Sequence, residues 1–477
     1  MALRTSGKSR NSRGKDQPPI IRSPALENLE QIATSPDRAR SVAGTATEAR
    51  PRSSSKPPSG PLGDAREGQE TASDTQPSQQ DRHIDPLPVH AGRADYRLLA
   101  IVSGLLCFGL VMVYSASTSP VYGDPSSLFR RELLWVGLGL ITMFLTMNIP
   151  YDRWRYLSIA VMAGALVLLV LVLVVGKNVN GGQRWLPVGP FTFQPSELAK
   201  LAFTLYIADW LSRKGKQVSS FMYGLVPFAI LTGVVIMLVM LQNDMGTAII
   251  IATFAVAMFI TAGANLLHLL PMMLSGVVTF AWIAFNTPFR VSRLEAFRDP
   301  LNCGPTSPSY QVCQGLLALG SGGITGLGLG NSRQKAGYLP NPWTDSIFAV
   351  IGEELGFIGC FIVILLIVML TYRAFRVGRR ALEVYGGLLA TGVACWIAVQ
   401  AMLNIGSVVA IIPFTGVPLP FISFGGSSLV TTMAAIGILL NISRYSDYSS
   451  SSGTEKNADT HLRRRDRRPY LSGAGRR

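Results

Sequence analysis

Residues Asn331–Phe357 read NSRQKAGYLPNPWTDSIFAVIGEELGF, and the character of the chain changes inside this stretch. Its first half is polar and interrupted by proline and glycine, which predicts a loop. From Ile347 onward the residues are mostly apolar, which predicts a helix. Asp345 stands where the two halves meet. The stretch carries four further charged residues, namely Arg333, Lys335, Glu353 and Glu354. It therefore predicts a basic loop that enters an apolar helix, with a carboxylate at the boundary.

The rest of the chain contains two kinds of sequence. Residues 1–95 contain no Phe, Trp or Tyr, and residues 446–477 combine a serine run with the basic cluster at 463–465. Such segments cannot bury enough apolar surface to offset their chain entropy, so we expect two disordered tails. The net charge of +15 lies partly in these tails and in loops, where it favours contact with anionic lipid headgroups. Nucleic acid is not an expected partner, because no foldable soluble segment combines basic and aromatic residues.

Between the tails, residues 96–445 are dense in apolar runs. A membrane-spanning helix needs about 20 mostly apolar residues. The sequence predicts an all-α integral membrane protein with ten such helices, and polar tails at both ends agree with an even number. The predicted spans are centred on Leu105, Leu140, Val167, Tyr206, Val234, Phe254, Val277, Val363, Ile397 and Ala435.

The distribution of Lys and Arg in short loops predicts that both tails lie in the cytoplasm. One extracytoplasmic loop, residues 287–345 between the seventh and eighth spans, is nevertheless basic. Long loops escape the charge rule, so the orientation stands. Contact with outer-leaflet headgroups and a pocket for a phosphate-bearing lipid both explain this charge. Its basic residues are Arg290, Arg293, Arg298, Arg333 and Lys335.

Two of the five cysteines, Cys303 and Cys313, lie in this same loop. In an extracytoplasmic location a disulfide and a pair of free thiols both fit. The spacing carries no zinc signature. No metal-ligand cluster, nucleotide-binding loop or Ser/His/Asp arrangement occurs in the sequence.

Polar residues also mark the start of the fourth span. Gln194, Glu197 and Lys200 are spaced so that they stay near one helix face, and a Glu197–Lys200 pair would order the start of the helix. Just before them, Arg184 and Trp185 suit either a membrane-interface belt or the binding of a sugar and a phosphate.

Three further sites carry carboxylates near or within apolar runs. Asp244, in the tight turn before the sixth span, is interpreted as a helix cap. Asp345 fits either a cap on the eighth span or a catalytic group beside the cations that precede it. Glu353 lies about 12 Å deeper than Asp345 at 1.5 Å per residue, so we interpret Glu353 and Glu354 as buried polar anchors, with Lys200 as a candidate partner.

The order of several motifs resembles the SEDS family (shape, elongation, division and sporulation), the FtsW/RodA-like proteins of bacterial wall synthesis. The resemblance covers about residues 96–445. Asn243 departs from the proline that the family often has before the aspartate of the tight turn. The motifs are NGGQRW (180–185), QPSELAK (194–200), QNDMGTA (242–248), SGGITGLGLGNSRQKAGYLP (321–340), TDSIFAVIGEELG (344–356) and PFTGVPLPFISFGGSS (413–428).

This resemblance implies ten spans and a peptidoglycan glycosyltransferase that polymerises lipid II on the outer face of the cell membrane. It implies a class B penicillin-binding protein as partner. The long cytoplasmic tail is more typical of the division branch, which would place the protein at the septum with other divisome proteins bound to its tails. The family's essential aspartate corresponds to Asp345, its Arg-Trp pair to Arg184 and Trp185, and the basic residue of its Gln-Lys pair to Lys335.

Sugar transfer from a lipid-linked pyrophosphate needs a base for the acceptor hydroxyl and cations for the leaving group. The expected base is Asp345, and Trp185 is expected to pack against sugar or lipid. A divalent cation stays open as a cofactor. A lipid II flippase and a divisome scaffold acting through the tails are the alternative functions. The expected pyrophosphate-binding residues are Arg184, Lys335, Arg293 and Arg298.

Overall fold

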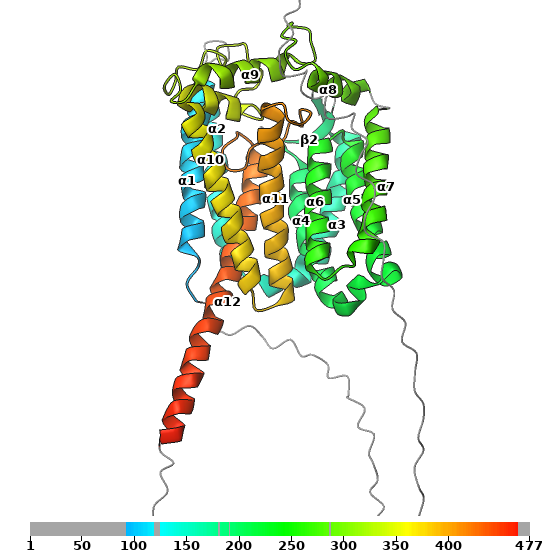
Figure 1. The fold of residues 1–477 in the computed structure, drawn as a ribbon, viewed down its shortest axis with the longest axis vertical. Helices are drawn as coiled ribbons and strands as arrows, with labels where there is room; N and C mark the ends of the chain where they lie inside the picture. Colours follow the sequence, from blue (N-terminus) through cyan, green and yellow to red (C-terminus); the bar gives the residue numbers. More distant parts are fainter. Residues whose placement is uncertain (1–91, 119–124, 180–181, 190, 286–287, 466–477) are drawn as a thin grey trace, which may run out of the picture. The chain divides into compact units, whose positions relative to one another are not determined.

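A computed structural model describes residues 92–118, 125–179, 182–189, 191–285 and 288–465 (Figure 1). The predicted N-terminal tail lies outside the described residues up to residue 91, and so do residues 466–477 of the C-terminal tail. The described helices are α1 (Tyr96–Ser117), α2 (Pro125–Asn148), α3 (Tyr151–Val175), α4 (Pro195–Lys214), α5 (Val226–Leu241), α6 (Met245–Thr261), α7 (Leu266–Phe285), α8 (Pro288–Arg298), α9 (Tyr310–Gly322), α10 (Ile347–Arg380), α11 (Val384–Val408) and α12 (Gly426–Arg465).

The helices confirm a mostly helical membrane protein. Each predicted span centre falls inside a different helix, namely α1 to α7 and α10 to α12. Among the described residues, six helices are long and apolar enough to cross a membrane, and α6 and part of α7 are shorter apolar helices. The six segments are Tyr96–Ser117, Tyr151–Val175, Phe221–Leu241, Ile347–Arg380, Val384–Val408 and Gly426–Tyr445.

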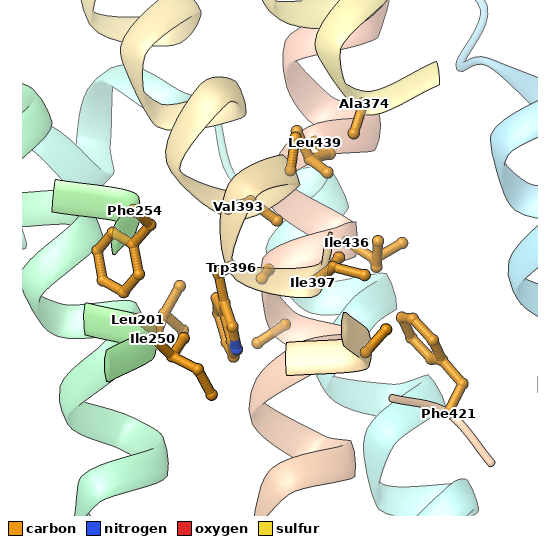
Figure 2. Close-up of a cluster of buried hydrophobic side chains, with 14 of the residues drawn as sticks. Leu201, Ile250, Phe254, Ala374, Val393, Trp396, Ile397, Phe421, Ile436 and Leu439 are labelled. Atoms are coloured by element: carbon orange, nitrogen blue, oxygen red, sulfur yellow. The ribbon is translucent and has the colours of Figure 1, made fainter. Parts of the chain in front are cut away.

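The core lies where α11 packs between α4, α6 and α12. Trp396 and Ile397 of α11 lie between Leu201 and Phe254 on one side and Ile436 on the other (Figure 2). All of these side chains are buried. By contrast, many large apolar side chains on α3 and on the long part of α10 are exposed. Apolar residues on both the inner and outer faces of a helix are typical of helices that lie in lipid.

The prediction of an all-α fold misses a small antiparallel sheet between α3 and α4. Its strands are β1 (Lys177–Val179), β2 (Gly182–Val188) and β3 (Phe191–Phe193). Lys177 pairs with Trp185, and Leu186 pairs with Phe193. The strands are short, and the sequence has glycine between consecutive strands or at their ends, at Gly181, Gly182 and Gly189, which is a signal of hairpins. The sheet places Arg184 and Trp185 on a fixed strand instead of a loop.

The predicted extracytoplasmic loop of residues 287–345 contains two helices, α8 and α9, which lie across one end of the bundle (Figure 1). Cys303 and Cys313 form a disulfide whose Cα atoms are 5.4 Å apart. The disulfide connects the segment after α8 to the first turn of α9. The structure therefore resolves the alternative between a disulfide and free thiols in favour of the disulfide.

The helix α10 breaks at Gly356, which has φ 65°. The preceding loop supplies backbone partners to the break. Leu327 N and Gly328 N donate to the carbonyl oxygens of Glu353 and Glu354, both at 2.9 Å, and two amides beyond the break donate back to that loop. Backbone groups at membrane depth must be satisfied within the protein. The glycine-rich run before residue 331 therefore provides hydrogen-bond partners for the backbone groups at the break in α10.

The predicted disordered tail begins at residue 446, and α12 continues past that residue to Arg465. Extending an existing helix fixes one residue for each new hydrogen bond, so it lacks the nucleation cost of a separate helix. The part of α12 up to Tyr445 is packed in the bundle and provides that nucleus.

Candidate active site

Asp244 organises the turn between α5 and α6. It is the N-cap of α6, and its Oδ1 accepts a hydrogen bond from Thr247 N at 3.3 Å, which confirms the predicted cap. Its Oδ2 accepts from Gln194 Nε2 at 3.0 Å and from Ser196 Oγ at 3.1 Å. The carboxylate therefore joins this turn to the start of α4.

Two arginines from different elements donate hydrogen bonds to the same turn. Arg184 of β2 donates from Nη2 to Asn243 O at 2.6 Å, and its Nη1 lies 3.8 Å from Asp244 Oδ1. Arg290 of α8 donates from Nη2 to Asn243 Oδ1 at 3.3 Å and to Met240 O at 3.1 Å. The sheet and α8 are thus fixed to the turn before α6, so their cations gather on one side of the bundle.

Arg293 lies one helical turn after Arg290 on α8. Its Nη1 donates to Phe414 O at 2.9 Å and to Thr415 O at 3.2 Å, so the irregular segment after α11 holds its guanidinium. Burial lowers the pKa of Arg293, and the nearby positive charge of Arg184 lowers it further. Arg298, at the end of the same helix, is exposed and has no such contacts among the described residues. The structure therefore brings Arg293 into the site and leaves Arg298 outside it.

Asp345 reaches the same place from the start of α10. Ser346 is the N-cap of α10, so Asp345 does not take the capping position that the sequence left open. Thr344 Oγ1 donates to its Oδ1 at 2.9 Å. A Cβ atom built on Gly416 would lie 3.7 Å from Asp345 Oδ2 and 3.8 Å from Arg293 Nη2. Gly416 therefore faces both the carboxylate and the guanidinium.

Opposing effects act on the pKa of Asp345. Burial raises the pKa of Asp345, and the hydrogen bond from Thr344 and the positive charge of Arg293 counteract part of that rise. A carboxylate with a raised pKa is a stronger base than an ordinary aspartate. The arrangement joins a proton acceptor to cations that can stabilise an anion.

Gly416 is expected to be sensitive to substitution. Its φ is 70°, and a left-handed backbone costs a residue with a Cβ about 1–2 kcal/mol. In Gly416→Ala the added methyl would also lie in van der Waals contact with Asp345 and Arg293, next to the groups proposed to act on the substrate. We expect glycan polymerisation to fall about tenfold or more.

Gly425→Ala is the matched control, because a Cβ at Gly425 also meets its neighbours at ordinary contact distances, but these neighbours are Ser428 and Pro418 and the φ of Gly425 is not left-handed. Polymerisation rates and thermal stability of the two purified variants provide the measurement. Equal rates in Gly416→Ala and Gly425→Ala would contradict the assigned importance of Gly416.

Known proteins are similar to this chain in sequence and in fold. A family model described as "Cell cycle protein" (FtsW, RodA and SpoVE) matches residues 96–448. The chain belongs to this family. It is similar to stage V sporulation protein E of Bacillus subtilis, with 42% identity over 359 residues, covering 74% of this chain and 98% of that protein. It is also similar to a probable peptidoglycan glycosyltransferase FtsW of Idiomarina loihiensis, with 39% identity over 354 residues, covering 73% and 86%.

Solved structures are also similar to this chain. One, reported as "Structural coordination of polymerization and crosslinking by a peptidoglycan synthase complex", matches with a TM-score of 0.62 and 29% identity, covering 74% of this chain and 98% of that chain. The rod shape determining protein RodA of Thermus thermophilus matches with a TM-score of 0.56 and 30% identity, covering 74% and 97%.

In this FtsW/RodA-like chain, the predicted role of Lys335 needs correction. Its ammonium group is buried and lies 2.8 Å from Glu354 Oε1 and 2.9 Å from Ser115 O. Ser115 Oγ and Thr118 Oγ1 lie within 3.3 Å of it. A lysine has three donors, and these oxygens already use them. We therefore interpret Lys335 as a structural residue and leave it out of the proposed anion site.

The predicted buried anchors are confirmed, but their partners differ from the expected one. Glu354 pairs with Lys335, and Glu353 accepts from Ser332 Oγ and from Arg333 N. Neither glutamate pairs with Lys200. That lysine instead forms the expected pair with Glu197, at 2.8 Å.

Sequence reasoning missed two buried amides on α11. Gln400 Oε1 accepts from Lys200 Nζ at 2.8 Å and from Trp396 Nε1 at 2.7 Å, and Gln400 Nε2 donates to Pro418 O at 3.0 Å. One turn later, Asn404 contacts the segment that carries Asp345. The sequence contains a signal for both amides, because polar residues spaced by four in an apolar span lie on one helix face and are expected to face protein.

The site has two further features. Trp185 is half-buried on β2, next to Arg184. Within the described ranges, no group of three or more His, Cys, Asp or Glu residues gathers as a metal site.

Proposed function

We propose that the protein is a peptidoglycan glycosyltransferase that polymerises lipid II into glycan strands and releases undecaprenyl pyrophosphate. The observation that carries the proposal is the approach of Asp345 Oδ2 and Arg293 Nη2 to within 3.7 and 3.8 Å of one point, the position of a Cβ atom built on Gly416. The family and the FtsW-type names of its relatives support the same reaction.

In the proposed reaction, Asp345 removes the proton from the acceptor sugar hydroxyl as that oxygen attacks the anomeric carbon of the donor. The bond between this carbon and the pyrophosphate oxygen breaks, and negative charge develops on the leaving group. Arg293 and Arg184 stabilise that charge, and Trp185 packs against sugar or lipid. A carboxylate whose pKa is raised by burial suits the base role, because a better-matched base gives more efficient proton transfer.

The proposed setting is the bacterial cell membrane, with the ten helices that contain the predicted centres all crossing it. Both tails would lie in the cytoplasm, and α8, α9 and the sheet would lie on the outer face, where lipid II is polymerised. A class B penicillin-binding protein is the proposed partner, and the likeness to a chain of a peptidoglycan synthase complex supports it. Action at the division septum and the binding of divisome proteins by the tails follow from the same proposal.

Reconstitution of the full chain in lipid vesicles tests the function. With lipid II and a catalytically inactive penicillin-binding partner, we expect glycan polymer and stoichiometric undecaprenyl pyrophosphate. A parallel assay follows transbilayer movement of labelled lipid II. Flipping without polymer would favour the flippase, and neither activity, with normal recruitment of division proteins, would favour the scaffold.

A further inference from the structure

Asn404 lies in the middle of the site although it is distant in sequence from its other members. It is fully buried on α11. Its Nδ2 donates to Asp345 O at 2.8 Å and to Val417 O, also at 2.8 Å. Both acceptors are carbonyl oxygens, so only the amide nitrogen can face them. Its Oδ1 has no hydrogen-bond partner among the described residues, so within them the side chain bonds only through its amide nitrogen.

The two acceptors belong to the two segments that form the site. Asp345 O belongs to the residue that carries the proposed base. Val417 O belongs to the segment after α11, next to Gly416, and Phe414 O and Thr415 O of that segment hold the Arg293 guanidinium. One amide group therefore connects the backbone of the base to the segment that holds the cation.

The connection bears on catalysis because neither Asp345 nor Val417 lies in a regular helix or strand. Asp345 lies outside the helical part of α10, between a loop and the Ser346 cap. The segment around Gly416 has no regular helix or strand. Removing the amide would leave two buried carbonyls without donors, and both segments would move to find replacements.

We propose that Asn404 is a positioning residue, which sets the spacing between the Asp345 carboxylate and the Arg293 guanidinium. The proposal rests on the role assigned to Asp345 and adds a residue to which sequence reasoning assigned no role. Catalysis depends on such spacing, since a displacement of about 1 Å can lower a rate about 100-fold.

A second buried asparagine provides the matched control. Asn441 of α12 donates from Nδ2 to Met147 O at 2.7 Å and accepts from Tyr151 N at 2.9 Å. It is 1% exposed and, like Asn404, connects separate segments through two hydrogen bonds. Its partners lie at the junction of α2 and α3. Asn441→Ala therefore reports the cost of losing such a connection away from Asp345.

The test compares Asn404→Ala, Asn404→Ser and Asn441→Ala in the full chain, reconstituted with lipid II and its penicillin-binding partner. We expect kcat of Asn404→Ala to fall about 10- to 100-fold with little change in KM. Asn404→Ser can restore at most one of the two bonds, so it should fall in between. Asn441→Ala should lose thermal stability but keep its kcat.

A double-variant cycle separates positioning from general destabilisation. If Asn404 acts through the spacing of the two groups, the fold loss of kcat in the double variant Asn404→Ser with Arg293→Lys should be smaller than the product of the losses in the two single variants. For Asn441→Ala and Arg293→Lys, the fold losses of kcat in the single variants should multiply in the double variant. Equal kcat losses in Asn404→Ala and Asn441→Ala, or a multiplicative result for Asn404→Ser, would overturn the inference. If the wild-type protein forms no glycan polymer, the proposed function fails. If Asp345→Asn polymerises normally, the base role of Asp345 fails; if that variant is inactive while Asn404→Ala has normal kcat, only the positioning role fails.

Discussion

Asp345→Asn is expected to lower the rate of glycan polymerisation by about 100- to 10,000-fold, because the amide cannot accept the proton of the acceptor hydroxyl. The substitution keeps the size of the side chain and an oxygen that can accept from Thr344 Oγ1. The two segments around the site stay connected, since Asn404 contacts the backbone oxygen of residue 345 and not its carboxylate. We therefore expect normal insertion and normal thermal stability.

The measurement is the polymerisation rate of purified protein in vesicles with lipid II and the partner. Asp299→Asn makes the same chemical change at an exposed position between α8 and α9 and serves as the control. It should keep the wild-type rate. An Asp345→Asn protein that polymerises as fast as this control would remove Asp345 from the mechanism.

The pH dependence of the wild-type rate gives an independent check on the same residue. Burial disfavours the charged form, so the pKa of Asp345 is raised above its usual value near 4. The base works only when deprotonated, so the rate should decline as the pH falls through this raised pKa. Arg293→Gln removes a positive charge that lowers the pKa of Asp345, so its acid decline should begin at a higher pH. An acid limb unchanged by Arg293→Gln would contradict this coupling.

Local sequence patterns predicted those parts of the structure that depend on neighbouring residues. The apolar runs located the ten helices that contain the predicted centres, because a helix satisfies its own backbone. The Asp244 cap and the Glu197–Lys200 pair involve residues within three positions of each other. Such contacts follow from helix geometry alone.

Contacts between distant segments could not be predicted in this way. Asn404 and Asp345 are 59 residues apart, and Arg293 and Phe414 are 121 apart. Charge alone gave Lys335, Arg293 and Arg298 equal status in the basic loop. Their roles differ because Glu354 pairs with the first, the segment at Gly416 holds the second, and the third is exposed.

The buried pair between Lys335 and Glu354 gives the largest expected effect on stability. Glu354 is fully buried, and its carboxylate accepts from Lys335 Nζ and from Ser115 Oγ. Glu354→Gln keeps the shape of the side chain but leaves the ammonium group buried without a negative partner. Breaking a buried pair from one side costs about 3–5 kcal/mol. We expect the variant to lose its folded state at a clearly lower temperature than the wild type.

Replacing both members separates this structural cost from any role of Lys335 in binding pyrophosphate. Buried ion pairs can often be exchanged for apolar residues of similar volume at little cost, so Lys335→Met combined with Glu354→Met should regain most of the lost stability. Because Asp345 and Arg293 do not depend on this pair for their contacts, the double variant should also regain polymerisation.

Glu295→Gln, at an exposed position on α8, is the control for loss of a carboxylate and should melt as the wild type does. The fraction folded after heating and the rate of polymerisation decide the matter. A double variant that is stable but inactive would return Lys335 to the substrate-binding residues, whereas a Glu354→Gln protein as stable as the control would show that the pair contributes little to the fold.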